Sequence, residues 1–166
     1  MTGFNSLSNK PIIAIVGRPN VGKSTLFNRL TGTKNAIVSD TSGTTRDRLI
    51  AETTWGDKQL VLVDTGGFDS HSQEPVWDQV LLQIESALEQ CDVIIFLVDT
   101  TEGINPIDQD VAKILRVKDK PVVLAANKSD NDTRRAYASE FYELGFDDPI
   151  PISAYHNYGV EDLMDA

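Results

Sequence analysis

The stretch GRPNVGKSTLFNRL, from Gly17 to Leu30, decides how the sequence is interpreted. Its first eight residues fit the pattern G-x-x-x-x-G-K-[ST] at every fixed position. The stretch follows the apolar run PIIAIV (11–16) and opens a helical pattern that ends near Gly32. A strand, a glycine-rich turn and a helix in this order predict a phosphate-binding loop, because the backbone N–H groups of such a turn and the helix N-terminus both favour anions.

Two side chains of this loop have predictable tasks. Lys23 is expected to reach the phosphates, and the hydroxyl of Ser24 is expected to bind Mg²⁺. The residues expected to contact the nucleotide in this stretch are Gly17, Arg18, Pro19, Asn20, Val21, Gly22, Lys23, Ser24 and Thr25.

Outside this stretch, apolar runs alternate with helical patterns. We expect strands over 11–16, 49–55, 59–64, 92–99, 121–128 and 149–153, and helices over 23–30, 76–90, 107–117, 133–144 and from Val160. Strands that alternate with helices predict a parallel sheet with helices on both faces. The turn residues 56–58 predict a hairpin, which makes 49–55 antiparallel. The fold class is therefore α/β: a P-loop NTPase with a mostly parallel six-stranded sheet and one antiparallel strand.

Composition limits the classes of partner. The chain has 166 residues and a net charge of −10, so its surface as a whole is a poor candidate for binding nucleic acid or a membrane. Cys91 is the only cysteine, which excludes an intrachain disulfide and is typical of a reducing compartment. We expect a flexible lead-in over 1–10, then a domain over 11–166 that is cytoplasmic, monomeric by itself and cut from a longer protein.

A P-loop needs a second acid for its metal, and the sequence offers two. Asp64 and Asp99 both close an apolar strand. Asp64 is preferred because Gly66 and Gly67 follow it, and the resulting pattern D-x-x-G allows a main-chain N–H to approach a terminal phosphate. The expected nucleotide contacts here are Asp64, Thr65, Gly66, Gly67 and Phe68.

The segment Asn127-Lys128-Ser129-Asp130 follows the strand PVVLAA. It lies where parallel sheets bind ligands, at the carboxyl ends of the strands. The carboxylate of Asp130 can accept hydrogen bonds from N1–H and the exocyclic amine of guanine, whereas adenine presents an unprotonated N1. Asn127 is expected to bind the base or the loop, and the methylenes of Lys128 to cover the ring. Ser153-Ala154 would bring a backbone N–H towards the guanine O6.

These motifs in this order resemble the Ras-like GTPase superfamily, and more closely the EngA (Der) family of ribosome-assembly GTPases. The resemblance covers essentially all of residues 11–166 through GRPNVGKSTLFNRL, SDTSGTTRDR, DTGG, NKSD and PISA. DTGG points to the first of that family's two tandem G domains. The resemblance implies a Ras-like fold, GTP and GDP as ligands, and GTP hydrolysis. It also implies a role in large ribosomal subunit assembly, with ribosomal RNA and proteins as partners of the full-length molecule.

The resemblance also assigns the residues of hydrolysis. Thr45, in preference to Thr44, would bring a hydroxyl to Mg²⁺ and the γ-phosphate. Phe68 occupies the position where Ras-type enzymes have the glutamine that orients water, so slow intrinsic turnover is expected. In related GTPases an asparagine at the position of Asn20 helps to bind K⁺ beside the phosphates. Lys23, Thr45 and Asn20 are therefore the expected catalytic residues, with Mg²⁺ and K⁺ as cofactors.

Alternatives remain at this point. The chain could be another K⁺-type GTPase, of the Era-like or tRNA-modification kind, or a scaffold that holds a nucleotide with negligible hydrolysis. An ATPase is disfavoured by Asp130. A further group of charged residues is expected to face solvent: Arg46, Arg48, Asp108, Asp110, Asp147 and Asp148. For Arg46 and Arg48 the alternative is that one of them assists hydrolysis as a cis arginine.

Overall fold

A computed structural model of the chain describes residues 10–32, 36–40, 47–65 and 75–165, with only the backbone of 36–40 and 47–49. The strands are β1 (Ile12–Val16), β2 (Ala36–Asp40), β3 (Asp47–Trp55), β4 (Lys58–Asp64), β5 (Val93–Asp99), β6 (Val122–Asn127) and β7 (Ile150–Pro151). The helices are α2 (Lys23–Thr31), α3 (Val76–Gln90), α4 (Pro106–Arg116), α5 (Asp132–Tyr137), the 3-10 helix η2 (Ala138–Leu144) and α6 (Val160–Asp165).

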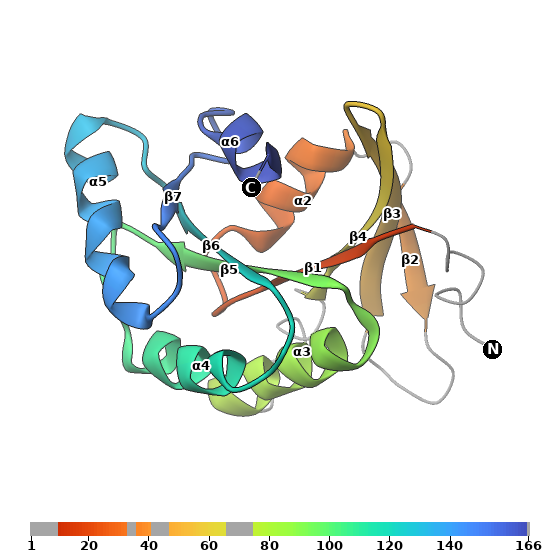
Figure 1. The fold of residues 1–166 in the computed structure, drawn as a ribbon, viewed down its shortest axis with the longest axis horizontal. Coiled ribbons are helices and arrows are strands. Elements are labelled where there is room, and N and C mark those ends of the chain that lie inside the picture. Colours follow the sequence, from red (N-terminus) through yellow and green to blue (C-terminus); the bar gives the residue numbers. More distant parts are fainter. Residues whose placement is uncertain (1–9, 33–35, 41–46, 66–74, 166) are drawn as a thin grey trace.

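The strands form one sheet in the order β2-β3-β4-β1-β5-β6-β7 (Figure 1). β1 lies at the centre and pairs in parallel with β4 and β5, and β6 and β7 continue the parallel arrangement. β3 runs antiparallel to both β2 and β4. All strands except β3 therefore point the same way, and their carboxyl ends share one edge of the sheet.

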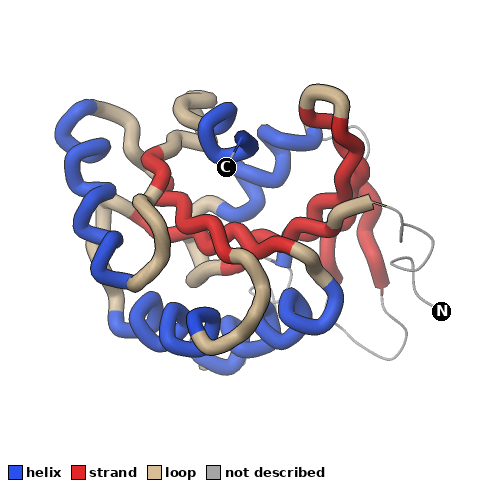
Figure 2. The backbone as a smooth tube through the Cα atoms, in the orientation of Figure 1, coloured by secondary structure: helices blue, strands red, loops and turns tan. Residues whose placement is uncertain are grey.

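Helices cover both faces of the sheet, which Figure 2 shows as one layer between two others. α3 and α4 pack below it in that view, and α2 and α6 pack above it. The alternation along β1 explains the two cores, because neighbouring strand residues point to opposite faces. Ile12, Ala14 and Val16 join the core under α3 and α4, whereas Ile15 joins the core under α2 and α6.

The six strands expected from the sequence are all present, and the single antiparallel strand is the hairpin partner β3. The structure adds β2 at the sheet edge, inside a polar stretch whose composition favoured a loop. The helix expected over 133–144 is present as α5 followed by η2, and it ends at Gly145, whose φ of 92° is left-handed. Local sequence patterns thus located most elements. The pairing of β2 at the sheet edge and the 3-10 geometry of η2 depend on contacts with other parts of the chain, which those patterns do not show.

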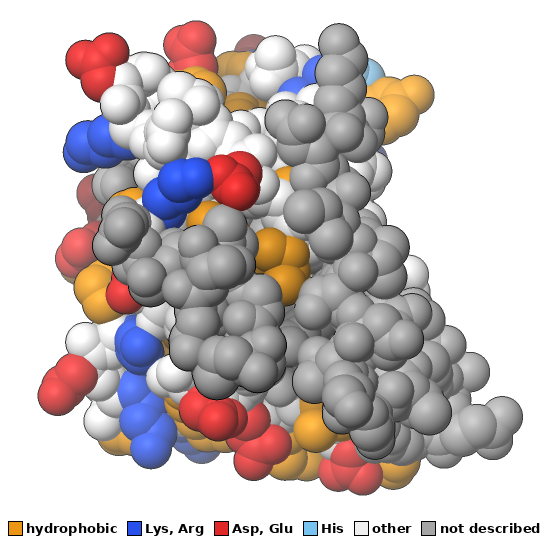
Figure 3. Space-filling model, turned by 90° about the vertical axis from the view of Figure 1, so that its right-hand side faces the viewer, with side chains coloured by type: hydrophobic (Ala, Val, Ile, Leu, Met, Phe, Trp, Pro, Cys, Tyr) orange, Lys and Arg blue, Asp and Glu red, His pale blue; other side chains and the backbone are white. Residues whose placement is uncertain are grey.

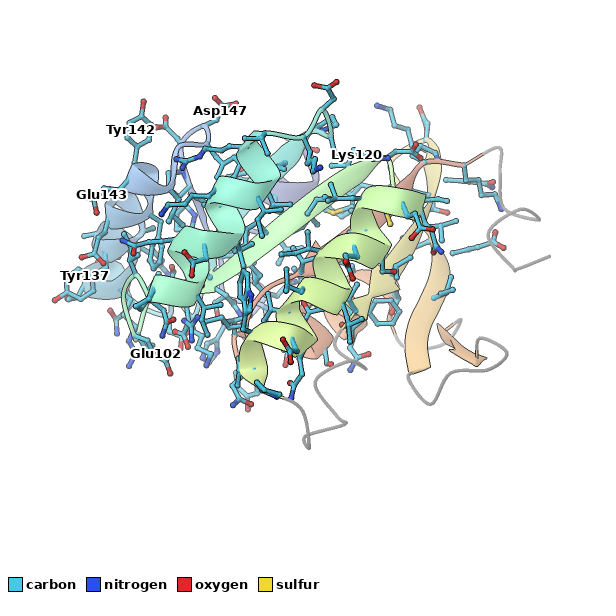
Figure 4. The ribbon with its side chains drawn as sticks, turned by 90° about the horizontal axis from the view of Figure 1, so that it is seen from below. Glu102, Lys120, Tyr137, Tyr142, Glu143 and Asp147 are labelled. Atoms are coloured by element: carbon cyan, nitrogen blue, oxygen red, sulfur yellow. The ribbon has the colours of Figure 1, made fainter. Side chains whose placement is uncertain are left out.

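The surface agrees with an acidic, globular domain. Acidic and basic side chains are interspersed on the face shown in Figure 3. Tyr137, Tyr142, Glu143 and Asp147 point outward from the α5 side of the molecule (Figure 4). Within the described ranges, no helix is both long enough and apolar enough to span a membrane.

Candidate nucleotide-binding site

Five strand ends bring the predicted motifs to one edge of the sheet. Gly17 follows β1, Asp64 ends β4, Asp99 ends β5, Asn127 ends β6, and Ser153 lies two residues beyond β7. These strands are parallel, so their carboxyl ends meet, although the residues are far apart in sequence. In open α/β folds, ligands bind at the carboxyl edge of the sheet, next to the strand from which the chain connections lead in opposite directions. Here that strand is β1.

The loop after β1 wraps around a buried ammonium group. Lys23 Nζ donates to the carbonyl oxygens of Gly17, at 2.8 Å, and Arg18, at 2.7 Å. Gly22 precedes α2 with a φ of 104°, and a Cβ there would lie 2.3 Å from Asn127 Nδ2. The loop therefore needs glycine at 22 both for its backbone conformation and for the close approach of Asn127.

Asp64, rather than Asp99, lies beside the serine expected to bind the metal. Ser24 Oγ donates to Asp64 Oδ2 at 3.0 Å, and Asp64 is buried. Asp99 instead forms an ion pair with Lys128, with 2.9 Å between Oδ2 and Nζ. The two candidate acids of the sequence thus have different neighbours, and only Asp64 is placed to share a cation with Ser24.

Asp99 holds Lys128 in position across the phosphate loop. Burial acts to raise the pKa of the Asp99 carboxyl, but hydrogen bonds from Thr101 and Lys128 outweigh it and leave the pKa below its ordinary value. Lys128 Nζ also donates to Asn20 O at 2.8 Å. The backbone φ of Lys128 is 65°, a conformation that non-glycine residues seldom adopt. The side chain therefore lies against the phosphate loop, and the contact of its methylenes with a base ring stays a prediction.

Asn127 joins the phosphate loop to the segment after β7. Its Nδ2 donates to Val21 O at 2.8 Å, and its Oδ1 accepts from Ala154 N at 3.0 Å. The sequence left open whether Asn127 binds the base or the loop, and in this structure it binds the loop. Both hydrogen bonds are buried, so the amide ties together two parts of the chain separated by more than a hundred residues.

The carboxylate of Asp130 lies at the outer end of the same edge. Its Oδ1 accepts from Ser153 Oγ at 2.7 Å, and its Oδ2 accepts from Arg134 at 3.2 Å. A hollow of about 690 Å³, large enough for a small-molecule ligand, lies beside the loop. Its lining comes from both motifs and consists of Pro19, Asn20, Gly22, Lys23, Ser24, Thr25 and Lys128.

Asp108 departs from the expectations, and its partner is Arg18 of the phosphate loop. Asp108 is fully buried rather than facing solvent, and its Oδ1 lies 2.9 Å from Arg18 Nε. Burial raises the pKa of the Asp108 carboxyl, while Arg18 opposes the rise. Glu102, labelled in Figure 4, pairs with Arg18 Nη1 at 2.9 Å. The side chain of Arg18 is thus directed to the start of α4, and only its carbonyl oxygen lies against Lys23. The prediction for Asp108 was wrong. It followed the rule that acidic residues are usually exposed, whereas here Arg18 and the backbone N–H of Asn105 stabilise the carboxylate in a buried position.

One polar residue at the site was not identified from the sequence. Gln83 of α3 is fully buried, and its Oε1 accepts from Gly17 N and Thr65 Oγ1, each at 3.1 Å. Thr65 Oγ1 also lies 2.6 Å from Ile15 O. The available signal was a glutamine at a position where helix periodicity calls for an apolar residue, between Val80 and Ala87.

Several predicted residues lie outside the described ones. They are Thr44, Thr45, Gly66, Gly67 and Phe68, together with Arg46 and the side chain of Arg48. The expected lead-in falls outside as well, apart from Lys10. The roles assigned to these residues stay predictions.

Comparison with known proteins agrees with this geometry. The family profile of 50S ribosome-binding GTPases matches residues 12–128, from β1 to the Lys128 motif. The chain belongs to this family. It is a GTPase domain of the Ras-like fold, with the P-loop, the Asp64 strand end and the NKSD segment all within or directly beside the matched range.

Individual relatives support the same assignment. GTPase Der of Moorella thermoacetica is 53% identical over 156 residues, which are 94% of this chain and 36% of that protein. Era of Aquifex aeolicus, bound to GDP and AlF4−, has a TM-score of 0.71 and 33% identity over 93% of this chain and 54% of its own. Era in complex with MgGDPNP and nucleotides 1506–1542 of 16S ribosomal RNA has a TM-score of 0.70 and 30% identity, with coverage of 93% and 54%. The chain thus spans about a third of the Der relative and matches one of its G domains.

Proposed function

We propose that this domain binds GTP and GDP with Mg²⁺, hydrolyses GTP, and serves as a nucleotide switch in assembly of the large ribosomal subunit. The observation that carries the proposal is the double hydrogen bond of Asn127, to Val21 O and from Ala154 N. It fixes the phosphate loop against the segment that carries Asp130 and Ser153. The proposed phosphate site and the proposed base-reading carboxylate thereby lie along one edge of the sheet.

The phosphate end of the pocket is built for an anion. Lys23 is buried and is held by two carbonyl oxygens, which a bound phosphate oxygen would replace as a partner of its charge. The amides of the loop and the N-terminus of α2 add further donors. The nine residues of α2 begin at Lys23 itself, so the cation and the helix end act at the same place.

The residues beside Lys23 fit Mg²⁺. Ser24 Oγ and Asp64 Oδ2 are hard oxygen donors 3.0 Å apart, and Mg²⁺ is usually held by one or two protein oxygens plus phosphates and waters. When bound, the ion would neutralise charge that develops on the phosphates. The relative Era is bound to MgGDPNP, which supports the same cofactor here.

The base end favours guanine. Asp130 presents two carboxylate oxygens whose present partners, Ser153 Oγ and Arg134, are both exchangeable because a hydroxyl rotates and Arg134 is partly exposed. A guanine edge would supply two N–H donors to this carboxylate. The backbone N–H of Ala154, which now bonds to Asn127, lies next to this position.

Hydrolysis would rest on charge placement rather than on a glutamine. Lys23 holds the phosphate in place, and Thr45 is proposed to meet the metal in the GTP state. Because Phe68 cannot orient water by hydrogen bonding, we propose that K⁺ beside Asn20 supplies the missing positive charge. Single-turnover hydrolysis with Mg²⁺ and K⁺ separates this enzyme from the alternative of a scaffold that holds a nucleotide.

The ribosomal partner is proposed from the relatives. The matched family is described as ribosome-binding, and Era is seen with a segment of 16S ribosomal RNA. The net charge of −10 disfavours broad contact with RNA through this domain alone. We therefore propose that ribosomal contacts depend on the full-length protein, of which this is the first G domain. A cytoplasmic location stays a prediction.

The decisive experiment measures binding of GTP, GDP, ATP and XTP to the wild type and to Asp130→Asn. The wild type is expected to prefer GTP and GDP. Hydrogen bonds to a charged acceptor contribute about 1.5–3 kcal/mol each, so loss of two should weaken GTP binding by about 100-fold or more. The substituted amide can donate to the extra carbonyl of xanthine, and preference should move to XTP.

Asp132→Asn is the matched control, because Asp132 is two residues away and its side chain is 99% exposed in an ion pair with Arg135. It should leave all four affinities as in the wild type. If the affinities of Asp130→Asn for GTP, GDP and XTP equal those of the wild type, the base pocket has been assigned to the wrong residues.

A further inference from the structure

Gln83 lies on the buried face of α3, beside apolar side chains of the core. Val80, Ile84 and Ala87 of the same helix are buried in the core under the sheet, and Gln83 is buried as completely as they are. Burying a carboxamide is unfavourable unless its hydrogen bonds are made. A leucine would fill the position at lower cost, so the polar group calls for a reason in the contacts that it makes.

Those contacts reach both halves of the phosphate site. Gln83 Oε1 lies 3.1 Å from Gly17 N, the first amide of the phosphate loop. The same oxygen lies 3.1 Å from Thr65 Oγ1, and Thr65 directly follows Asp64. One carbonyl oxygen has two lone pairs, so it can accept from both donors. The hydroxyl of Thr65 has a single proton, which it shares between Gln83 Oε1 and Ile15 O, 2.6 Å away. Both donor residues are buried, where water cannot substitute for the glutamine.

Each of the two donors is adjacent to a residue that is proposed to contact the nucleotide or the metal. Gly17 O is one of the two acceptors of Lys23 Nζ, so the position of the Gly17 peptide sets part of the lysine's surroundings. Gly17 is also packed tightly, since a Cβ there would lie 2.5 Å from Leu97 O. Asp64, next to Thr65, accepts from Ser24 Oγ. A shift of either peptide would therefore misplace Lys23 or Asp64.

We infer that Gln83 is a positioning residue of the nucleotide site, which holds the phosphate loop and the Asp64 strand end in register through one oxygen. Helix α3 thereby becomes part of the phosphate and metal site, although no α3 side chain lines the hollow beside Lys23. The inference rests on the proposed function, because its consequences appear in nucleotide and Mg²⁺ binding.

The test compares dissociation constants for GDP measured with Mg²⁺ and with EDTA. Gln83→Leu leaves the buried Gly17 N–H without its acceptor, and a loss of this kind corresponds to about tenfold weaker GDP binding in EDTA. It should also reduce the factor by which Mg²⁺ tightens GDP binding, because Asp64 loses its support. Thr65→Val keeps the shape and removes the hydroxyl with its bonds to Gln83 and Ile15. It should reduce the Mg²⁺ factor alone, and any part of the loss that comes from Gln83 should be absent when Thr65→Val is added to Gln83→Leu.

Two further variants separate positioning from packing. Gln83→Asn keeps the carboxamide one methylene shorter, so it stays polar but cannot reach both donors, and its GDP binding should follow Gln83→Leu. Gln90→Leu makes the same exchange at the last residue of α3 and should match the wild type. If Gln83→Leu does not fold, Gln83→Asn and Thr65→Val give the result.

The outcomes are distinct. Wild-type-like GDP affinity and Mg²⁺ factor in Gln83→Asn or Gln83→Leu, with only a lower melting temperature, would overturn the inference and leave Gln83 a packing residue. Absence of GDP binding by the wild type would instead overturn the proposed function. Non-additive effects of Gln83→Leu and Thr65→Val on the Mg²⁺ factor would support the shared oxygen.

Discussion

Lys23 and Lys128 show how the surroundings of one residue prepare a site. Lys23 is buried, and its ammonium group donates to two backbone carbonyl oxygens of the phosphate loop. Lys128 pairs with Asp99, whose pKa is held below its ordinary value. The backbone of the loop thus holds the ammonium group of Lys23, whereas a buried carboxylate holds that of Lys128.

Asn20 carries the prediction about K⁺. Its backbone φ is 71°, and its carbonyl accepts from Lys128, so the residue shapes the loop whatever its side chain binds. If the side-chain oxygen binds K⁺, GTP hydrolysis in KCl should be about tenfold or more faster than in NaCl, and Asn20→Ala should lose the difference. Steady-state phosphate release in the two salts measures this.

Asn20→Gly distinguishes the two roles of Asn20. Glycine adopts the left-handed conformation without strain, so it preserves the loop and removes only the amide. It should lose the K⁺ effect as completely as Asn20→Ala. Retention of K⁺ stimulation by Asn20→Gly would contradict the assignment and leave Asn20 a loop-shaping residue.

Among the elements, the phosphate loop and the helices around it are fixed by different kinds of contact. α4 begins with a capping box. Asp108 Oδ2 accepts from the backbone N–H of Asn105, and Asn105 Oδ1 accepts from the backbone N–H of Ile107. The other oxygen of Asp108 forms an ion pair with Arg18, so the start of the helix and the phosphate loop share one carboxylate. The order of the loop thus depends on α4 as well as on α2.

Gly22 joins the phosphate loop to the start of α2. Gly22→Ala combines a left-handed φ with a Cβ placed 2.3 Å from Asn127 Nδ2, so Asn127 must move and release Val21 and Ala154. We expect GDP binding to weaken by about tenfold or more, because a buried hydrogen-bonded pair is broken. Isothermal titration with GDP measures the loss.

The control is Gly32→Ala at the end of α2. Gly32 has a φ of 69°, but a Cβ there meets nothing within 4 Å. It should cost about 1–2 kcal/mol of unfolding free energy through its backbone alone and leave GDP binding unchanged. Equal binding losses in both variants would show that backbone strain, rather than the contact with Asn127, explains Gly22.

For the whole molecule, the site exists only because distant parts of the chain fold together. A nucleotide that contacts both Lys23 and Asp130 should therefore stabilise the entire fold. At a GDP concentration 100-fold above its dissociation constant, the expected gain is about 2.7 kcal/mol, which corresponds to about 5–10 °C in melting temperature. Far-UV circular dichroism and the fluorescence of Trp55 and Trp77 should report the same shift.

The same experiment includes its own check. Asp130→Asn, at the same GDP concentration, should show a much smaller gain, whereas Asp132→Asn should match the wild type. Separate transitions for the two probes, with only one of them responding to GDP, would contradict a single cooperative unit.

The class of fold, the phosphate loop and the bounds of most elements could be predicted from the sequence. These follow from local rules: glycine spacing around Lys23, apolar periods of 2 and 3.6 residues, and left-handed glycines such as Gly145 that end helices. The NKSD segment also carried its own chemistry, because two carboxylate oxygens suit a guanine edge wherever they lie.

The partners of the polar residues, in contrast, became known only from the folded structure. It paired Asp64 with Ser24 and Asp99 with Lys128, buried Asp108 against Arg18, and placed Gln83 under Gly17 and Thr65. No local pattern distinguishes these choices, because each depends on which strand lies next to which and on which helix face meets the sheet. Parallel pairing around β1 made those neighbours, and burial required a hydrogen-bond partner for the side chains of Asp64, Asp99, Asp108 and Gln83.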